Sequence, residues 1–271
     1  MHIMRKKWGI VLKALGISGV LLVFRLIIDA LNLDVITVNT VISAFVGGAI
    51  FTIAIIFSGT LIDFKESEKI PGDLASAIRN LYHDSRVIQV GDTGLIKDFQ
   101  SHIKALMKVI NTNFRSNAWR QREITPAIDV INDDICRLAR KNVPPQFIVK
   151  LRTEISAVDR LSNRIEVIME TSFIPAAYAI SELATAASIF VLLFIKLDPF
   201  YEGLVVFLVF AAVLIALNLL IRDMDNPFEI GDDSHADVDM ELLWKLEEYL
   251  KEKIPEKEPE PSIREHTNMV M

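Results

Sequence analysis

Residues Val38 to Ile62 read VNTVISAFVGGAIFTIAIIFSGTLI, and no ionisable side chain interrupts them before Asp63. A helix that crosses the hydrocarbon core of a bilayer needs about 20 consecutive apolar residues. This stretch is longer than that requirement. We therefore predict that it forms a transmembrane helix.

Small side chains recur along this helix. Ala44, Gly48 and Thr52 are spaced four residues apart, while the bulky Val41 and Phe45 lie on an adjacent line. In lipid, lines of small residues let two helix backbones approach closely. The same pattern also suits a helix that lines a pore, so the residues alone leave helix packing and pore lining both open.

The composition places the whole chain in a membrane. Of its 271 residues 51% are apolar, the apolar residues are concentrated in blocks, and the formal charge is −6. This combination predicts an all-α integral membrane protein with a lipid bilayer as its surroundings. An acidic chain lacks the basic surface that nucleic acid requires. The single cysteine, Cys136, cannot form an internal disulfide.

Three further apolar spans are expected, at about residues 8–31, 174–195 and 204–221. Basic residues at positions 5–7 precede the first span, and such residues stay on the cytoplasmic side. This first run is too long for a signal peptide and no small-residue cleavage site follows it. We therefore expect an uncleaved span in the cell membrane (plasma or inner), with both termini in the cytoplasm.

The first span carries two charges near its outer end. Arg25 and Asp29 are one helical turn apart, so they can form an ion pair on one face and lower the energetic cost of charge in the membrane. The alternative is that they line an aqueous vestibule. Residues 32–36 contain no lysine and predict a short outer connection to the second span.

A polar region follows the second span, and its apolar residues recur at helical spacing, as in Leu74, Ile78 and Leu81. Helix breaks are expected at residues 71–72, 91–94, 115–117, 125–126 and 142–145, where glycine, proline and asparagine gather. The pattern predicts a bundle of about four cytoplasmic helices and no strand of consequence.

The chain is therefore expected to have five parts. They are a first transmembrane hairpin (1–63), a cytoplasmic helical region (64–173), a second transmembrane hairpin (174–222), an acidic loop with an amphipathic helix (223–254) and a tail (255–271). The tail consists of proline and charged residues with nothing to bury, so we expect it to be disordered.

Three separated patches resemble the bestrophin family of pentameric ion channels. Residues 44–52, AFVGGAIFT, are similar to the second span of that family, and residues 173–178, FIPAAY, resemble its Ile-Pro-x-x-Tyr entry to the third span. Residues 225–228, DNPF, and the aspartates after them resemble its Asn-Pro-Phe and acidic cluster. Order, spacing and the plan of four spans agree over nearly the whole chain. The family's Arg-Trp-containing end of the second span is replaced by residues 57–59, FSG, as in a divergent, prokaryotic-type member.

The resemblance implies a homopentamer in which the second spans surround one axial pore with a hydrophobic neck. The neck falls on Val41, Phe45 and Ala49, with Gly48 and Thr52 as neighbouring candidates. The family places bulky side chains at all three neck levels, so Ala49 implies a wider inner neck here.

The resemblance also implies a second constriction, a cytoplasmic aperture just after a proline at the start of the last cytoplasmic helix. That position matches Phe147 or its neighbours Gln146 and Ile148. Small inorganic ions are the expected cargo. Anions such as chloride are slightly favoured over monovalent cations, on grounds of resemblance alone.

Calcium is a possible ligand, although no cofactor is required. Four clustered carboxylates offer the hard oxygen ligands that Ca²⁺ takes, namely Asp232, Asp233, Asp237 and Asp239. Animal members of the family clasp calcium in this region, but the spacing differs here and His235 lies inside the loop. A solvated acidic loop is the alternative.

Three other functions compete with the channel. A non-conducting membrane scaffold or sensor, which binds a partner through its cytoplasmic helices, shares every expected helix with the channel. A secondary transporter would show internal repeats, and the two halves of this chain are not similar. An enzyme is not expected, because no P-loop, nucleophile elbow, CxxC or dinucleotide motif is present and the pair His83-Asp84 has no second pair at metal-ligand spacing.

Overall fold

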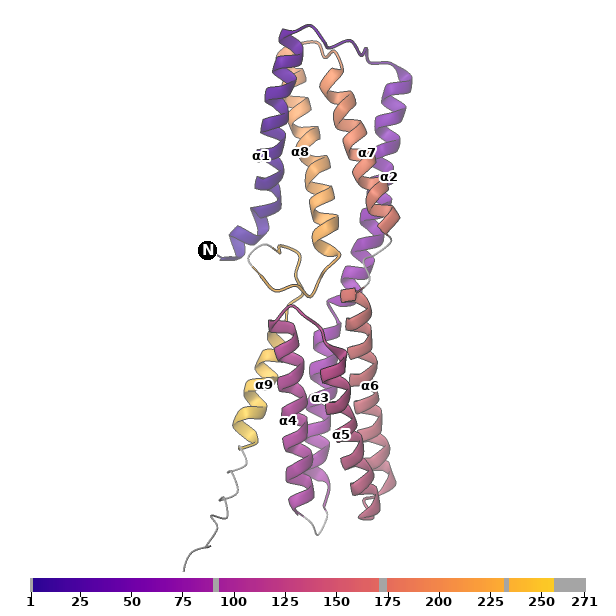
Figure 1. Ribbon diagram of the computed structural model, residues 1–271, viewed down its shortest axis with the longest axis vertical. Coiled ribbons are helices and arrows are strands. Elements are labelled where there is room, and N and C mark those ends of the chain that lie inside the picture. Colours follow the sequence, from indigo (N-terminus) through magenta and orange to yellow (C-terminus); the bar gives the residue numbers. More distant parts are fainter. Residues whose placement is uncertain (1, 90–92, 171–174, 232–233, 256–271) are drawn as a thin grey trace, which may run out of the picture.

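The chain folds into two helical bundles stacked end to end (Figure 1). The computed structural model describes residues 2–89, 93–170, 175–231 and 234–255, with side chains from Trp8 onward. Within these residues there is no β-strand, only an isolated bridge between Ile36 and Ile195. The prediction of an all-α membrane fold is confirmed for the described part of the chain.

The upper bundle in Figure 1, which we call the apolar bundle, contains α1 (His2–Ala30), α2 (Thr40–Ser67), α7 (Pro175–Phe194) and α8 (Phe200–Met224). Each of the four lies in a helical segment long and apolar enough to cross a membrane. Helix α1 packs on α8 and α7, and α2 packs on α7 and α8. The four predicted spans are therefore confirmed as helices, although Ile174, the expected start of the third span, lies outside the described residues.

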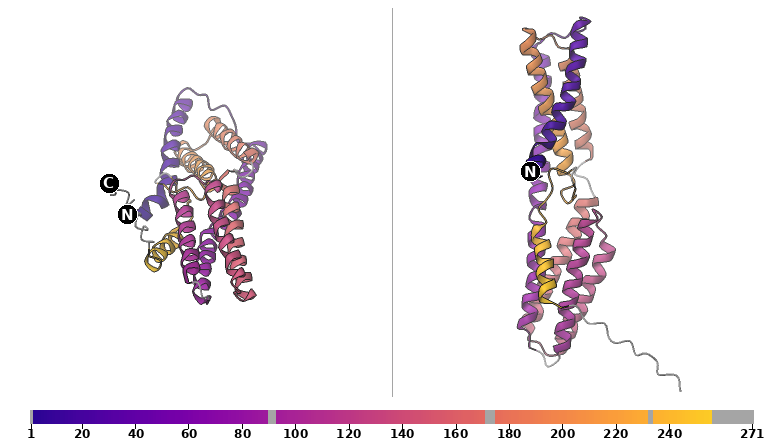
Figure 2. Two further views of the ribbon diagram at one scale, coloured as in Figure 1. Left: turned by 60° about the horizontal axis from the view of Figure 1, so that its bottom comes forward. Right: turned by 90° about the vertical axis from the view of Figure 1, so that its left-hand side faces the viewer.

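The lower bundle in Figure 1, which we call the polar bundle, contains α3 (Ile70–Val87), α4 (Thr93–Arg115), α5 (Gln121–Arg140), α6 (Pro145–Glu170) and α9 (Glu241–Lys253). Its core is large and well buried, with Phe99, Ile103 and Phe114 fully enclosed. Such amphipathic helices bury one apolar stripe and expose a charged face. Figure 2 shows the same two stacked bundles from other directions.

Helix α2 connects the two bundles because it does not end where its apolar stretch ends. The Asn39 side chain accepts the backbone N–H of Ile42 at the start of the helix, at 2.9 Å. The helix then continues through Asp63 to Ser67, and α3 begins at Ile70. Charged residues end a membrane span, but Lys65 and Glu66 are good helix formers and can continue the helix outside it.

The expected helix breaks at residues 115–117 and 142–145 lie where one helix ends and the next begins. Asn117 and Asn142 have φ angles of 50° and 58°, a left-handed conformation that asparagine tolerates. Of the break expected at residues 91–94, residues 91–92 lie outside the described residues.

The break expected at residues 71–72 was wrong, because Pro71 and Gly72 lie in the first turn of α3, where a proline is tolerated. The break expected at residues 125–126 was wrong, because Pro126 lies inside α5. A proline removes the hydrogen bond to the carbonyl four residues earlier and crowds that carbonyl. Here the carbonyl belongs to exposed Arg122 in the first turns of α5, where it can tilt outward and water can replace the lost bond.

At the end of the apolar bundle away from the polar bundle, Arg25 joins α1 to α7. Its guanidinium pairs with Asp29 at 2.9 Å, as the spacing predicted, and it donates to the Leu193 carbonyl at 2.6 Å. Close by, Ile36 donates to the Phe194 carbonyl and accepts from Lys196, at 3.0 and 2.8 Å. The end of α7 is therefore held by both α1 and the connection between α1 and α2.

Candidate functional site

One face of α2 is left open by the other helices of the chain. Val41 is 75% exposed and Phe45 is 45% exposed. Successive α-helical residues turn by about 100°, so Val41, Phe45, Gly48 and Thr52 fall within about 60° of one another. We call these four residues the open line of α2. No atom lies within 4 Å of a Cβ placed on Gly48, and the Thr52 hydroxyl donates to the Gly48 carbonyl.

Ala49 lies at the edge of the open line, about 40° around the helix from Phe45 and toward the side on which α2 packs on other helices. It is 8% exposed, and Ile53, one turn further along, is fully buried. Ile53 belongs to the core that α2 forms with α7 and α8, around Phe207. The five predicted neck residues are therefore divided between the open line and the packed side. Which of them face a pore depends on the assembly, so the neck stays a prediction.

The open line continues toward the polar bundle and ends in carboxylates. Asp63 and Glu66 fall within the same 60° of the helix as the open line, because they follow Val41 by 22 and 25 residues. Both are exposed, and Glu66 pairs with Arg164 of α6 at 3.1 Å. The uncharged upper part of this face therefore leads to an acidic lower part, which the sequence prediction did not include.

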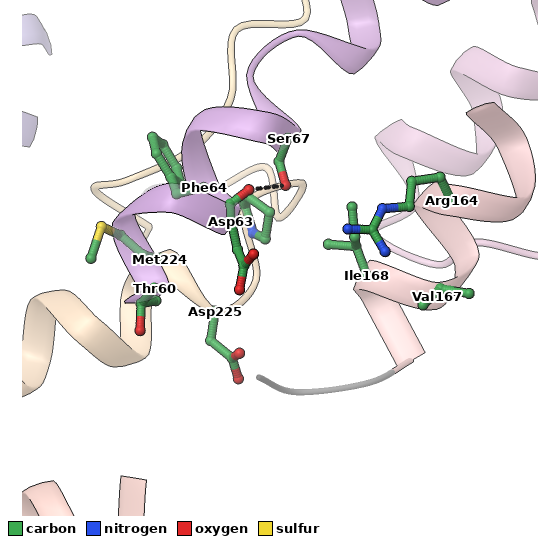
Figure 3. Close-up of a pocket in the computed structure, with 10 residues that line it drawn as sticks. Thr60, Asp63, Phe64, Ser67, Arg164, Val167, Ile168, Met224 and Asp225 are labelled. Atoms are coloured by element: carbon green, nitrogen blue, oxygen red, sulfur yellow. Dashed lines mark hydrogen bonds between the residues drawn. The ribbon is translucent and has the colours of Figure 1, made fainter. Parts of the chain in front are cut away.

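A cavity of about 170 Å³ lies beside this acidic part, where the two bundles meet. It is lined by the end of α2, the end of α6 and the residues around the end of α8. Figure 3 shows Asp63 and Asp225 on one side of it and Arg164 on the other. The Ser67 hydroxyl donates to the Asp63 carbonyl at 2.9 Å, which fixes the last turn of α2.

Two of the three resembling patches meet at this junction. The Tyr178 hydroxyl, from FIPAAY, donates to the carboxylate of Asp225, from DNPF, at 2.7 Å. Phe228 of the second patch is fully buried, and its ring centroid lies 5.8 Å from that of Phe114 in the polar bundle. These residues therefore fasten α7 and α8 to each other and to the polar bundle. Phe173 and Ile174 lie outside the described residues.

The predicted aperture residues lie in the first turn of α6, at the end of the polar bundle away from the membrane helices (Figure 1). Gln146 is exposed, while Phe147 and Ile148 are partly buried against the polar core. Next to them the Lys150 ammonium pairs with the Asp84 carboxylate at 2.7 Å. Sequence reasoning missed this pair, because its partners are far apart in the chain. The aperture itself stays a prediction.

The acidic loop is only partly described, since Asp232 and Asp233 lie outside the described residues. Asp239 accepts the backbone N–H of Glu241 at 2.8 Å and so starts α9. Within the described residues, no group of three or more His, Cys, Asp or Glu side chains is arranged to hold a metal ion. The calcium prediction, including Asp237, therefore stays untested.

A polar cluster between α7 and α8 was not predicted. The Asn218 side chain accepts from Ser181 at 2.9 Å and donates to Thr185, inside the apolar bundle. Interhelical hydrogen bonds of this kind join membrane helices. The spacing of Ser181, Thr185 and Ser188 could have revealed the stripe, because residues three or four apart share a helix face.

Comparison with known proteins identifies the fold. Neither a protein-family model nor a curated protein sequence matches this chain. A crystal structure of a bacterial bestrophin homologue from Klebsiella pneumoniae, a point variant, matches with a TM-score of 0.74 and 12% identity, over 89% of this chain and 95% of that one. The chain has the bestrophin fold.

Other solved structures agree with the bestrophin fold. A second variant of the Klebsiella pneumoniae homologue matches with a TM-score of 0.68 and 14% identity, over 90% of this chain and 97% of the other. A structure described only as a membrane protein matches with a TM-score of 0.73 and 13% identity, over 89% and 97%. The low identities mark this chain as a divergent example of the bestrophin fold.

Proposed function

We propose that the protein is a bestrophin-like ion channel in which several copies of α2 surround one axial pore. The observation that carries the proposal is the bestrophin fold over about nine-tenths of the chain, together with an uncharged face of α2 that the chain leaves open. A helix buried on one side and open on the other along a membrane span is suited to line a pore.

The proposed neck works by excluding water. Val41 and Phe45 are bulky, apolar and exposed on the open line. Repeated around an axis, they would form narrow apolar rings, which an ion cannot cross until slight widening admits water. Gly48, Thr52 and Ala49 follow below these rings and would leave a wider inner neck.

The proposed assembly is a homopentamer, as the resemblance implies. The single chain leaves many large apolar side chains uncovered, among them Phe24 of α1, Phe51 of α2 and Leu183 of α7. Lipid tails and neighbouring copies would cover these faces. The aperture at Gln146, Phe147 and Ile148 would then surround the same axis at the far end of the polar bundle.

The proposed topology places the polar bundle in the cytoplasm. Helix α1 begins and α8 ends at the end of the apolar bundle that faces the polar bundle (Figure 1). The basic residues at positions 5–7 favour the cytoplasmic side. Both termini would then be cytoplasmic, in a plasma or inner membrane.

The permeating ion is the finer part of the proposal. The resemblance puts anions such as chloride slightly first. Asp63 on the continued line of α2 favours monovalent cations as the second candidate, because rings of carboxylates select cations, whereas Glu66 is paired with Arg164. Currents from purified protein in a planar bilayer under a KCl gradient decide between them through the sign of the reversal potential.

The same recording tests the channel against the scaffold. A silent bilayer that demonstrably holds the assembled protein would favour a non-conducting scaffold or sensor that binds a partner through the polar bundle. Unitary currents that disappear when the protein is omitted would support the channel.

A further inference from the structure

Helix α1 does not pack on any described helix of the polar bundle. Among the described helices, it contacts only α8 and α7. Yet the segment between α8 and α9 lies beside the start of α1 in Figure 1. This segment, residues 226–231 and 234–240, can therefore connect α1 to the polar bundle.

The α8–α9 segment is firmly attached to the polar bundle. Phe228, Val238 and Met240 are buried in the polar core. The Asn117 side chain donates to the Ile230 carbonyl at 2.7 Å and accepts the Ile230 N–H at 2.8 Å. The segment is thus held by side-chain packing and by a paired set of hydrogen bonds to the backbone.

From this attachment the segment presents His235 to α1. The Asp223 carboxylate accepts the backbone N–H groups of His235 and Ala236, at 2.9 and 2.6 Å, which fixes the local backbone to the last turn of α8. A Cβ added to Gly9 would lie 1.9 Å from Nε2 and 2.3 Å from Cδ2 of His235. The imidazole therefore occupies the space of a side chain at position 9.

We propose that His235 on Gly9 is a latch that couples the membrane helix α1 to the polar bundle. At its other end α1 is fixed to α7 by Arg25. A displacement of the α8–α9 segment would be transmitted to the inner end of α1, because the imidazole fills the notch that the glycine leaves.

The test uses the full chain in lipid nanodiscs and four variants. Gly9→Ala forces the imidazole out of its notch, and His235→Ala removes the imidazole. The double variant restores space for the added methyl group. Gly16→Ala is the matched control, because a Cβ there meets nothing within 4 Å on the same helix.

The first readout is hydrogen exchange of backbone amides in the first turns of α1 and in residues 234–240. Gly9→Ala should raise exchange in both segments by about fivefold or more, a change expected for contacting residues. His235→Ala should raise it less, the double variant should not exceed His235→Ala, and Gly16→Ala should not raise it, because alanine favours a helix more than glycine does. Equal exchange in Gly9→Ala and the unmodified chain, or additive effects in the double variant, would overturn the latch.

The second readout is ion current from the same preparations, and this part rests on the proposed function. Gly9→Ala and His235→Ala should shift the open probability in the same direction, with no further shift in the double variant. Opposite or additive shifts would show that the latch does not act on conduction. If the unmodified chain passes no current, the proposed function fails, while the exchange experiment still decides the latch.

Discussion

The Tyr178 hydroxyl donates a hydrogen bond to the Asp225 carboxylate over 2.7 Å. The two residues are 47 positions apart, and each belongs to one of the patches that resemble bestrophins. Their bond closes the junction of α7 and α8 directly above the polar bundle. It gives a physical reason for a tyrosine and an aspartate at those positions.

This bond predicts a loss of stability in Tyr178→Phe. The substitution keeps the ring and removes the hydroxyl, so the Asp225 carboxylate loses one donor. The expected cost in the free energy of unfolding is about 1 kcal/mol, because hydrogen bonds to charged groups contribute somewhat more than neutral ones and this site is only partly buried. Thermal unfolding in detergent measures the loss. Tyr201→Phe, at an 80% exposed tyrosine, should leave the midpoint unchanged.

The proposed neck predicts that Phe45→Ala raises unitary conductance or holds the pore open. A smaller side chain widens the apolar ring and admits water. Phe51→Ala is the control, because Phe51 is 67% exposed on the same helix but lies about 120° around it from Phe45. Unchanged currents in a well-folded Phe45→Ala protein, or equal effects of both variants, would remove Phe45 from the neck.

The contacts of Arg25 with Asp29 and with the Leu193 carbonyl, which we call the Arg25 clamp, predict that Arg25→Met is strongly destabilising. The side chain is 5% exposed, and its loss leaves the Asp29 carboxylate without its cation. Removing one partner of a buried ion pair costs about 3 kcal/mol or more. Calorimetry in detergent should show a large drop for Arg25→Met and partial recovery in Arg25→Met with Asp29→Asn. A drop no larger than that of Lys13→Ala, at an exposed lysine, would contradict the clamp.

Glu247 predicts the acid sensitivity of the polar bundle. Burial alone would raise the pKa of this carboxyl, but hydrogen bonds from Lys251, Asn111 and Arg115 outweigh burial and hold the pKa below its usual value of 4.5. A carboxyl whose pKa is lower in the folded chain than in the unfolded chain stabilises the fold at pH values above its unfolded pKa. That stabilisation is lost as the pH falls through 4.5 toward the pKa of the folded chain.

This prediction is tested by measuring the thermal midpoint of the full chain from about pH 7 down to about pH 3, which spans the usual carboxyl pKa of about 4. The midpoint of the unmodified protein should fall more steeply below pH 4.5 than that of Glu247→Gln. Glu248→Gln, at the exposed neighbouring residue, should keep the steep fall. Parallel curves for Glu247→Gln and the unmodified protein would contradict it.

The sequence predicted what depends on local spacing. The apolar runs predicted four membrane helices, and the four-residue separation of Arg25 and Asp29 predicted their ion pair. Long-range relationships were not predictable from spacing. The pairing of Ile36 with Ile195 and the contact of His235 with Gly9 join segments that meet only after the helices pack.

Three features of the structure differ from what spacing alone indicates, each for a particular physical reason. The apolar stretch of the second span ends at Ile62, yet α2 continues to Ser67, because leaving a membrane does not require leaving a helix. Pro126 was read as a break, but near the start of α5 its missing hydrogen bond is tolerated. For the candidate site, the sequence grouped Ala49 with Phe45, whereas Ala49 is 8% exposed and Phe45 is 45% exposed, because Ala49 lies at the edge of the open line where α2 packs on other helices.

An image of the full chain in lipid nanodiscs, at a resolution that shows side chains, tests the proposed channel in one experiment. We expect five copies around an axis, with Val41 and Phe45 of every α2 pointing at that axis. A monomer or dimer, or a ring in which another face of α2 surrounds the axis, would contradict the proposed pore.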